Sequence, residues 1–181
     1  ILLIYLIPSN EEVINYKEEI EYVNKNVKTN TIFLLDSNNY LSSTKIIIEK
    51  TNTIDIAKEL INALIQNGVK QDSIPSGFKP LINSNTKINT LKIDNETIKI
   101  DLSKDYLDTN KNIEEKTLEA LVYTLTSIEN IKYIILYIDG EILTELPLNK
   151  IKLPNTLSRE IGINKKYSLN STKNISSTTT Y

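Results

Sequence analysis

Three aspartates form the densest acidic group of this sequence. Asp101, Asp105 and Asp108 all lie in the segment DLSKDYLDTNKN. The first, third and fifth places of that segment, Asp101, Ser103 and Asp105, have the spacing of a calcium-binding loop. However, Tyr106 stands where an EF-hand loop needs Gly, and Asn112 stands where it needs Glu. We therefore interpret the segment as a polar loop that leads into a helix, and we expect no metal site.

Catalysis by these carboxylates is the weakest of the functional alternatives. Paired carboxylates can cleave glycosidic bonds, but acidic residues are also common on loops, and their separation in space cannot be derived from the sequence. Ser103 and Lys104 do not make a catalytic dyad, because neighbouring strand residues point to opposite faces. The 181 residues contain no His and no Cys, which removes the usual zinc site, the thiol nucleophile and the His-based triad. We expect no enzyme activity, no catalytic residue and no cofactor.

Tyrosines offer a different chemistry, that of recognition. The chain has 10 Tyr against 2 Phe. Tyr133 and Tyr137 share one face of the most β-prone segment, which makes them the candidate interaction residues. The alternative is that they pack under a helix with the hydroxyl at its edge, as many tyrosines do.

Hydrophobic periodicity predicts which elements position these residues. The expected elements are strands at 31–35 and 40–48, a helix opening at Thr53, a long loop at 71–89, strands around 91–93 and 98–102, a helix at 112–128, and strands at 131–138 and 141–146. The 131–138 segment is nearly all apolar, which predicts a central, well-covered strand. The order predicts an α+β fold, a two-layer sandwich of a mixed β-sheet with two helices on one face.

The helix ends carry their own signals. Thr53 is a candidate N-cap for the first helix. Gly68 suits a left-handed closing position, with Val69 placed for the apolar contact that accompanies it. Asn112 and Glu115 have the spacing of a capping box for the second helix.

The two ends of the chain differ from its middle. Residues 1–8 are an apolar run ending in Pro, which we interpret as the end of a hydrophobic anchor; a buried edge strand is the alternative. Residues 9–30 have the pattern of a juxtamembrane helix and linker. We place the domain at 31–147. Residues 148–181 form a polar linker that leads into a second repeat or ends as a polar tail.

Charge argues against nucleic acid as a partner. The 21 basic and 23 acidic residues are spread along the chain and give a net charge of −2. No block is basic enough to follow a phosphate backbone.

The order of several short motifs resembles a known family. A strand ends in Ile100–Ser103 (IDLS), a helix carries Thr124–Thr126 (TLT) near its end, and a strand turns at Asp139–Gly140. From about residue 31 to 146 this order is similar to the GerMN domain family of sporulation and germination proteins in the bacterial envelope. The resemblance implies a ring-building-type fold and a structural or assembly role. It carries over no catalytic residues.

The resemblance also implies where such a protein works. Family members are membrane-tethered on the extracytoplasmic face, and their partners are other envelope or sporulation proteins or further copies. Lipoprotein members have an anchoring Cys that this chain lacks, so its tether would be the segment 1–8. The resulting hypothesis is a non-catalytic extracytoplasmic scaffold domain. The alternative is a module that binds a cell-wall glycan or small ligand through the Tyr face or the 71–89 loop.

Overall fold

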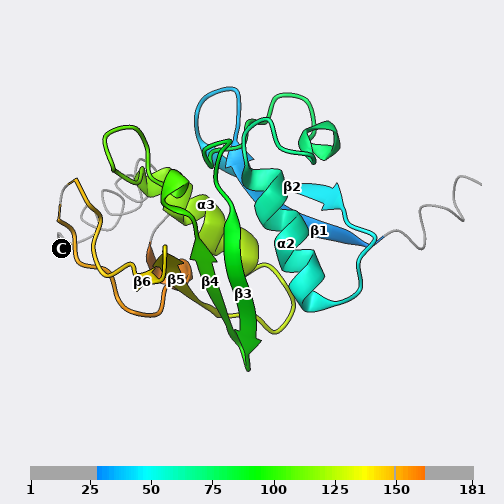
Figure 1. The fold of residues 1–181 in the computed structure, drawn as a ribbon. Helices are drawn as coiled ribbons and strands as arrows, with labels where there is room; N and C mark the ends of the chain where they lie inside the picture. The colour runs from blue at the N-terminus through cyan, green and yellow to red at the C-terminus, as the bar shows by residue number, and fades with distance from the viewer. Residues whose placement is uncertain (1–27, 149, 162–181) are drawn as a thin grey trace, which may run out of the picture.

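The computed structural model describes residues 28–148 and 150–161 (Figure 1). The expected anchor at 1–8, most of the expected juxtamembrane segment at 9–30 and the end of the chain from 162 lie outside these ranges. The elements are β1 (Thr29–Leu35), β2 (Leu41–Ile47), α2 (Thr53–Leu64), η1 (Gln71–Ser73), β3 (Ile88–Asp94), β4 (Thr97–Leu102), η2 (Lys104–Tyr106), α3 (Glu115–Leu125), β5 (Tyr133–Ile138), β6 (Glu141–Ile142) and η3 (Arg159–Ile161).

The strands form two sheets, whereas a single mixed sheet was predicted. One sheet has the order β3-β4-β5-β6, with β4 and β5 parallel and the other neighbours antiparallel. The other is the antiparallel hairpin of β1 and β2. The predicted α+β class with two helices and a mixed sheet is confirmed.

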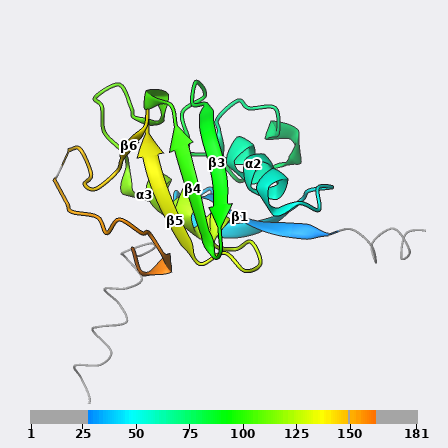
Figure 2. The same cartoon turned by 60° about the horizontal axis from the view of Figure 1, so that its bottom comes forward.

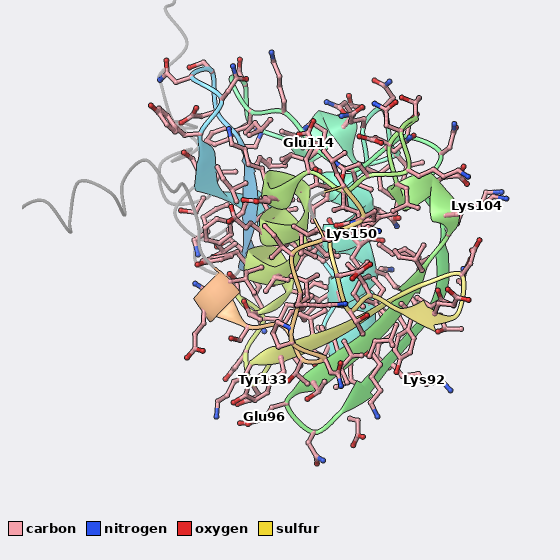
Figure 3. All side chains as sticks on the ribbon, turned by 90° about the vertical axis from the view of Figure 1, so that its left-hand side faces the viewer. Lys92, Glu96, Lys104, Glu114, Tyr133 and Lys150 are labelled. Carbon is pink, nitrogen blue, oxygen red and sulfur yellow. The ribbon has the colours of Figure 1, made fainter. Side chains whose placement is uncertain are left out.

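Helix α3 is the reason that the sheet is divided. Every residue from Thr117 to Leu125 is buried, so the helix needs partners on more than one side. Figure 3 shows it between the β1–β2 hairpin and the four-stranded sheet. Its large apolar residues form one buried stripe, and the other buried positions are filled by small or polar residues such as Ala120 and Thr124.

The four-stranded sheet has one covered face. Ile98, Ile100 and Leu102 of β4 and Ile134 of β5 are fully buried on the side of the helices. Figure 2 shows α3 behind the sheet, α2 beside β3 and the opposite face of the sheet turned to the viewer. The β4 strand therefore reads as alternating buried and half-buried residues, as one-sided sheets do.

The ends of α2 differ from the prediction by a residue or more. Asn52, and not Thr53, is the N-cap, because its side chain accepts the Ile54 N–H at 2.8 Å. The helix stops at Leu64, and the left-handed residue is Asn67 (φ +54°) instead of Gly68. The predicted apolar contact is also wrong, since Val69 is 87 % exposed.

The predicted capping box of α3 is wrong. The helix begins at Glu115, and its cap residue, Glu114, makes no side-chain cap hydrogen bond. The Asn112 side chain instead accepts the Leu148 N–H at 3.2 Å. Asn112 thus ties the loop before the helix to the C-terminal part of the chain, so it is not available to the helix end.

The end of the sheet is shorter and less covered than predicted. Strand β5 has one open face, because Tyr133 is 42 % exposed while Ile134 and Leu136 point inward. Strand β6 ends at Ile142 instead of 146, since the chain then turns back on itself through a bridge between Glu145 and Lys152.

The packed chain continues past the predicted boundary at residue 147. Leu157 is buried, and its backbone pairs with Ile134 at the edge of β5 that β4 does not occupy. Arg159 then lies over the rings of Phe33 and Tyr123, with its guanidinium carbon 5.8 Å and 5.3 Å from their centroids. Within the described residues, no helix is long and apolar enough to span a bilayer.

Candidate interaction surface

The uncovered face of the four-stranded sheet is the surface on which the predicted tyrosines lie. Side chains alternate along a strand, so the residues beside the buried ones point to this open face. We call it the open sheet face and define it by Thr90, Lys92, Asp94, Thr97, Lys99, Asp101, Tyr133, Ile135, Tyr137 and Ile142. Figure 3 shows Lys92, Glu96 and Tyr133 on this outer side of the sheet, away from α3.

Apolar and aromatic residues run along β5 and onto β6. Tyr133 and Tyr137 lie two positions on either side of Ile135, and Tyr137 pairs across to Ile142. Tyr133 and Ile142 are 42 % and 38 % exposed, and Ile135 and Tyr137 are half-buried. The open sheet face therefore has an aromatic and aliphatic strip along one side, the composition found at the centre of protein interfaces.

Charged residues of both signs border this strip. Lys99 pairs with Asp94 at 3.0 Å, and Lys132 pairs with Glu96 at 2.7 Å. The hydrogen bond from Lys132 to Glu96, helped by the charge of that carboxylate, raises the pKa of the Lys132 ammonium. These groups are solvent-exposed, so the pairs hold side chains in place more than they stabilise the fold.

A shallow hollow of about 210 Å³ lies on the same face. Its lining residues are Thr90, Lys92, Lys99, Asp101, Tyr137 and Gly140. The Asp101 carboxylate accepts the Gly140 N–H at 3.1 Å and so fixes the β5–β6 turn against β4. Asp101 thereby has a structural partner within the surface.

The three candidate aspartates do not come together. Asp101 lies on the open sheet face, whereas Asp105 accepts the Ser103 hydroxyl at 3.2 Å in the following turn. Asp108 accepts the N–H groups of Asn110 and Asn112, both at 2.8 Å, and so shapes the loop before α3. No cluster of three or more His, Cys, Asp or Glu suited to a metal occurs in the described parts of the chain.

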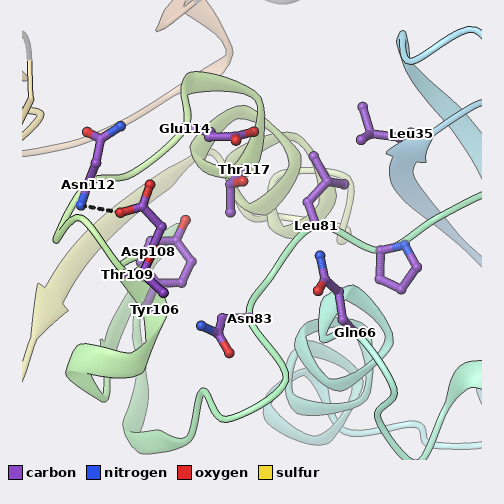
Figure 4. A pocket seen from close by; sticks show the side chains of 11 residues that line it. Leu35, Gln66, Leu81, Asn83, Tyr106, Asp108, Thr109, Asn112, Glu114 and Thr117 are labelled. Carbon is purple, nitrogen blue, oxygen red and sulfur yellow. Dashed lines mark hydrogen bonds between the residues drawn. The ribbon is translucent and has the colours of Figure 1, made fainter.

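A second concave site lies where two loops meet. The 71–89 loop was one of the two candidate ligand surfaces from the sequence, but the contribution of the loop before α3 was not predicted. The site is a pocket of about 340 Å³ between the end of the 71–89 loop and the loop that precedes α3 (Figure 4). Its lining residues are Leu35, Gln66, Pro80, Leu81, Asn83, Tyr106, Asp108, Thr109, Asn112, Glu114 and Thr117. The motif IDLSKDY places Tyr106 here, but its burial depends on contacts distant in sequence, so no local pattern could have identified the site.

Fold and surface together define the class of this protein. It is an α+β domain with two helices and a mixed sheet, and the open face of that sheet carries the exposed Tyr133 and the half-buried Tyr137. The chain belongs to the Germane family, described as "Sporulation and spore germination", whose model matches residues 31–144. The predicted resemblance to GerMN domains is thereby confirmed.

The relatives agree with this assignment. The spore germination protein GerM of Bacillus subtilis (strain 168) is 29 % identical over 134 residues, which cover 74 % of this chain and 36 % of that protein. The first GerMN domain of GerM superposes with a TM-score of 0.64 at 25 % identity, covering 74 % of this chain and 98 % of that structure.

A tandem arrangement is known for the same relative. The structure of the tandem GerMN domains of GerM matches with a TM-score of 0.66 at 26 % identity and covers 76 % of this chain and 48 % of that one. The chain thus spans about a third of the length of GerM and about half of the tandem structure.

Proposed function

We propose that this chain is a non-catalytic assembly domain of a membrane-tethered envelope protein that acts in spore formation or germination. In this role the open sheet face docks with a second domain of the same kind. The single observation that carries the proposal is the strip of Tyr133, Ile135, Tyr137 and Ile142 on a sheet face that no described element covers. Exposed aromatic residues at the centre of a patch are the usual anchors of protein interfaces.

The charges around the strip favour a like partner. Lys92 and Lys99 alternate with Asp94 and Asp101 on the same face, so the surface carries both signs at close spacing. A surface of this kind can pair with a copy of itself, because each lysine of one copy can form an ion pair with an aspartate of the other. GerM of Bacillus subtilis contains two GerMN domains in one chain, which supports a function that brings two such domains together.

The proposed membrane tether and extracytoplasmic location are inferred from the sequence of residues 1–30 and from the family resemblance. The apolar run at residues 1–8 and the polar segment after it have the pattern of an anchor followed by a stalk. Fractionation of cells that make the full-length protein tests this part. We expect the protein in the membrane fraction and accessible to protease added from outside; recovery with the cytoplasmic proteins would contradict it.

Cysteine crosslinking tests the docking face directly. The 181 residues contain no Cys, so a single introduced Cys reports on one position only. Thr97→Cys lies next to the aromatic strip, and Lys58→Cys lies on the exposed side of α2 as a matched control. We expect mild oxidation to link the Thr97→Cys chains into dimers and to leave the Lys58→Cys chains as monomers.

The outcome that overturns the docking proposal is equally specific. Equal crosslinking of the two variants would show that the chains meet at random or through another surface. Crosslinking of Lys58→Cys alone would move the interface to the helical side of the domain.

A further inference from the structure

The pocket between the two loops contains a buried hydroxyl without a partner. Tyr106 is 3 % exposed, and its phenol oxygen has no hydrogen-bond partner among the described residues. Figure 4 shows the ring beneath Asp108, with the oxygen directed toward Thr117 on the pocket side. Burial raises the pKa of the Tyr106 phenol, so the group keeps its proton and is a donor at any physiological pH.

An unpartnered buried hydroxyl is unfavourable for a folded domain. Burial removes the group from bulk solvent, and no described protein atom accepts its proton. A phenylalanine ring would fill the same space without that cost. The hydroxyl therefore points to an acceptor that is supplied from outside the described chain.

The walls of the pocket indicate what that ligand carries. The carboxylate of Glu114 and the second oxygen of Asp108 can accept hydrogen bonds, and the amide of Gln66 can both donate and accept. The side-chain oxygens of Asn83 and Asn112 already accept the N–H groups of Asn85 and Leu148, so their NH₂ groups are the donors that these two residues offer a ligand. No Lys or Arg lines the pocket, so an anionic ligand would meet two like charges with nothing to offset them.

The pocket also has an apolar side. Leu35 and Leu81 lie across the hollow from Asp108 and Asn112 (Figure 4), and Pro80 also lines it. Its volume of about 340 Å³ lies at the lower end of the range for small-molecule sites, roughly 300–1,000 Å³. A ring with hydroxyl and amide groups on its rim and apolar faces suits both sides.

We propose that this pocket binds a neutral sugar unit bearing hydroxyl and amide groups, and that Tyr106 donates its hydroxyl proton to an oxygen of that sugar. N-acetylated glycans are one class of polymer that exposes such sugar units. The pocket shares no residue with the open sheet face, so this inference stands apart from the docking proposal and either can fail alone. Of the two glycan surfaces considered from the sequence, the structure favours the 71–89 loop over the Tyr face.

Titration of the isotope-labelled 181-residue chain with soluble N-acetylglucosamine oligomers, followed by amide NMR, tests the proposal. We expect saturable shifts that are confined to the segments lining the pocket, which are residues 35, 66, 80–83 and 106–117. Tyr106→Phe should weaken binding by about tenfold, which is the effect of losing one well-placed hydrogen bond. The same variant should unfold at the same or a higher urea concentration, because its unpartnered hydroxyl is gone.

Tyr123→Phe is the matched control. The Tyr123 hydroxyl donates to the Arg159 carbonyl oxygen at 2.6 Å, so its removal should lower stability and leave binding unchanged. Three results would overturn the proposal. They are an absence of saturable shifts, equal binding by the wild type and Tyr106→Phe, and shifts produced only by a charged amine such as ethanolamine.

Discussion

The side-chain hydroxyl of Thr124 accepts the backbone N–H of Phe33 at 3.0 Å, across 91 residues of sequence. Thr124 is fully buried in α3, and Phe33 lies in β1. This bond attaches the β1–β2 hairpin to the helix that backs the four-stranded sheet. Thr124 is the first residue of the Thr-Leu-Thr sequence on which part of the family resemblance was based.

Thr124→Val should destabilise the domain by about 1–3 kcal/mol, the usual effect of leaving a buried donor unsatisfied. Valine has nearly the same shape, so little packing is lost. Thr124→Ser keeps the hydroxyl and should retain most of the stability. Urea unfolding followed by circular dichroism measures both, and equal midpoints for Val and wild type would contradict the role of the bond.

Arg159→Lys should destabilise the domain by about 1–2 kcal/mol although it keeps the charge. The guanidinium donates to the Ser127 hydroxyl at 2.6 Å and to the Tyr123 carbonyl at 3.3 Å while it lies over two rings. A lysine ammonium cannot reproduce that fork. Hydrogen exchange should then quicken first at residue 157, whose N–H pairs with Ile134. Unchanged exchange there would show that Arg159 does not hold the segment.

Asp36 should give the domain part of its acid sensitivity. The Tyr40 N–H, together with the Ser42 hydroxyl and the Asn38 N–H, holds the pKa of Asp36 below its usual 3.8. The unfolded chain therefore binds the proton more readily. This contribution to stability is complete above pH 3.8 and is lost as the pH falls through the lowered pKa.

Asp36→Asn should accordingly flatten the loss of stability in acid. Urea midpoints measured from neutral pH down to strongly acidic pH would show a smaller decrease for the variant than for the wild type. Parallel curves for the two proteins would mean that other carboxylates account for the whole acid effect.

Gly140→Ala should destabilise the β5–β6 turn by about 1–2 kcal/mol, the usual cost of the left-handed region for a residue with a Cβ. Gly140 has a φ of +85°, and an added Cβ would meet no atom within 4 Å, so the effect is purely conformational. Gly140→Asn should cost less, because Asn tolerates this region better. Thermal unfolding of the wild type, Gly140→Ala and Gly140→Asn measures both losses of stability. A midpoint for Gly140→Ala equal to that of the wild type would contradict the cost of the left-handed conformation.

Local patterns predicted most elements because they depend on neighbouring residues. Most strand positions, the presence of the two α-helices and the Asp139–Gly140 turn follow from alternation, helical period and turn chemistry. The helix ends were missed where neighbouring polar residues competed. Asn52 is the N-cap residue of α2 in place of Thr53. The Asn112 side chain accepts the Leu148 N–H and therefore does not cap α3.

Features that depend on distant contacts could not be predicted. Nothing near Thr124 in the sequence indicates that it binds Phe33, and the polar segment after 147 gave no sign that Arg159 would pack on two rings. The same holds for the unpartnered hydroxyl of Tyr106. The placement of Tyr133 and Tyr137 on one face did follow from their spacing, although their role in binding stays a prediction.

Sedimentation equilibrium of the 181-residue chain tests the central claim most directly. The docking proposal predicts a reversible dimer that dissociates on dilution, and Tyr137→Ser should weaken it by about tenfold or more, as expected for loss of an aromatic anchor. Val69→Ser removes an exposed apolar side chain outside the open sheet face and should leave the equilibrium unchanged. A chain that stays monomeric at every concentration, or a dimer that Tyr137→Ser does not weaken, would contradict the proposal.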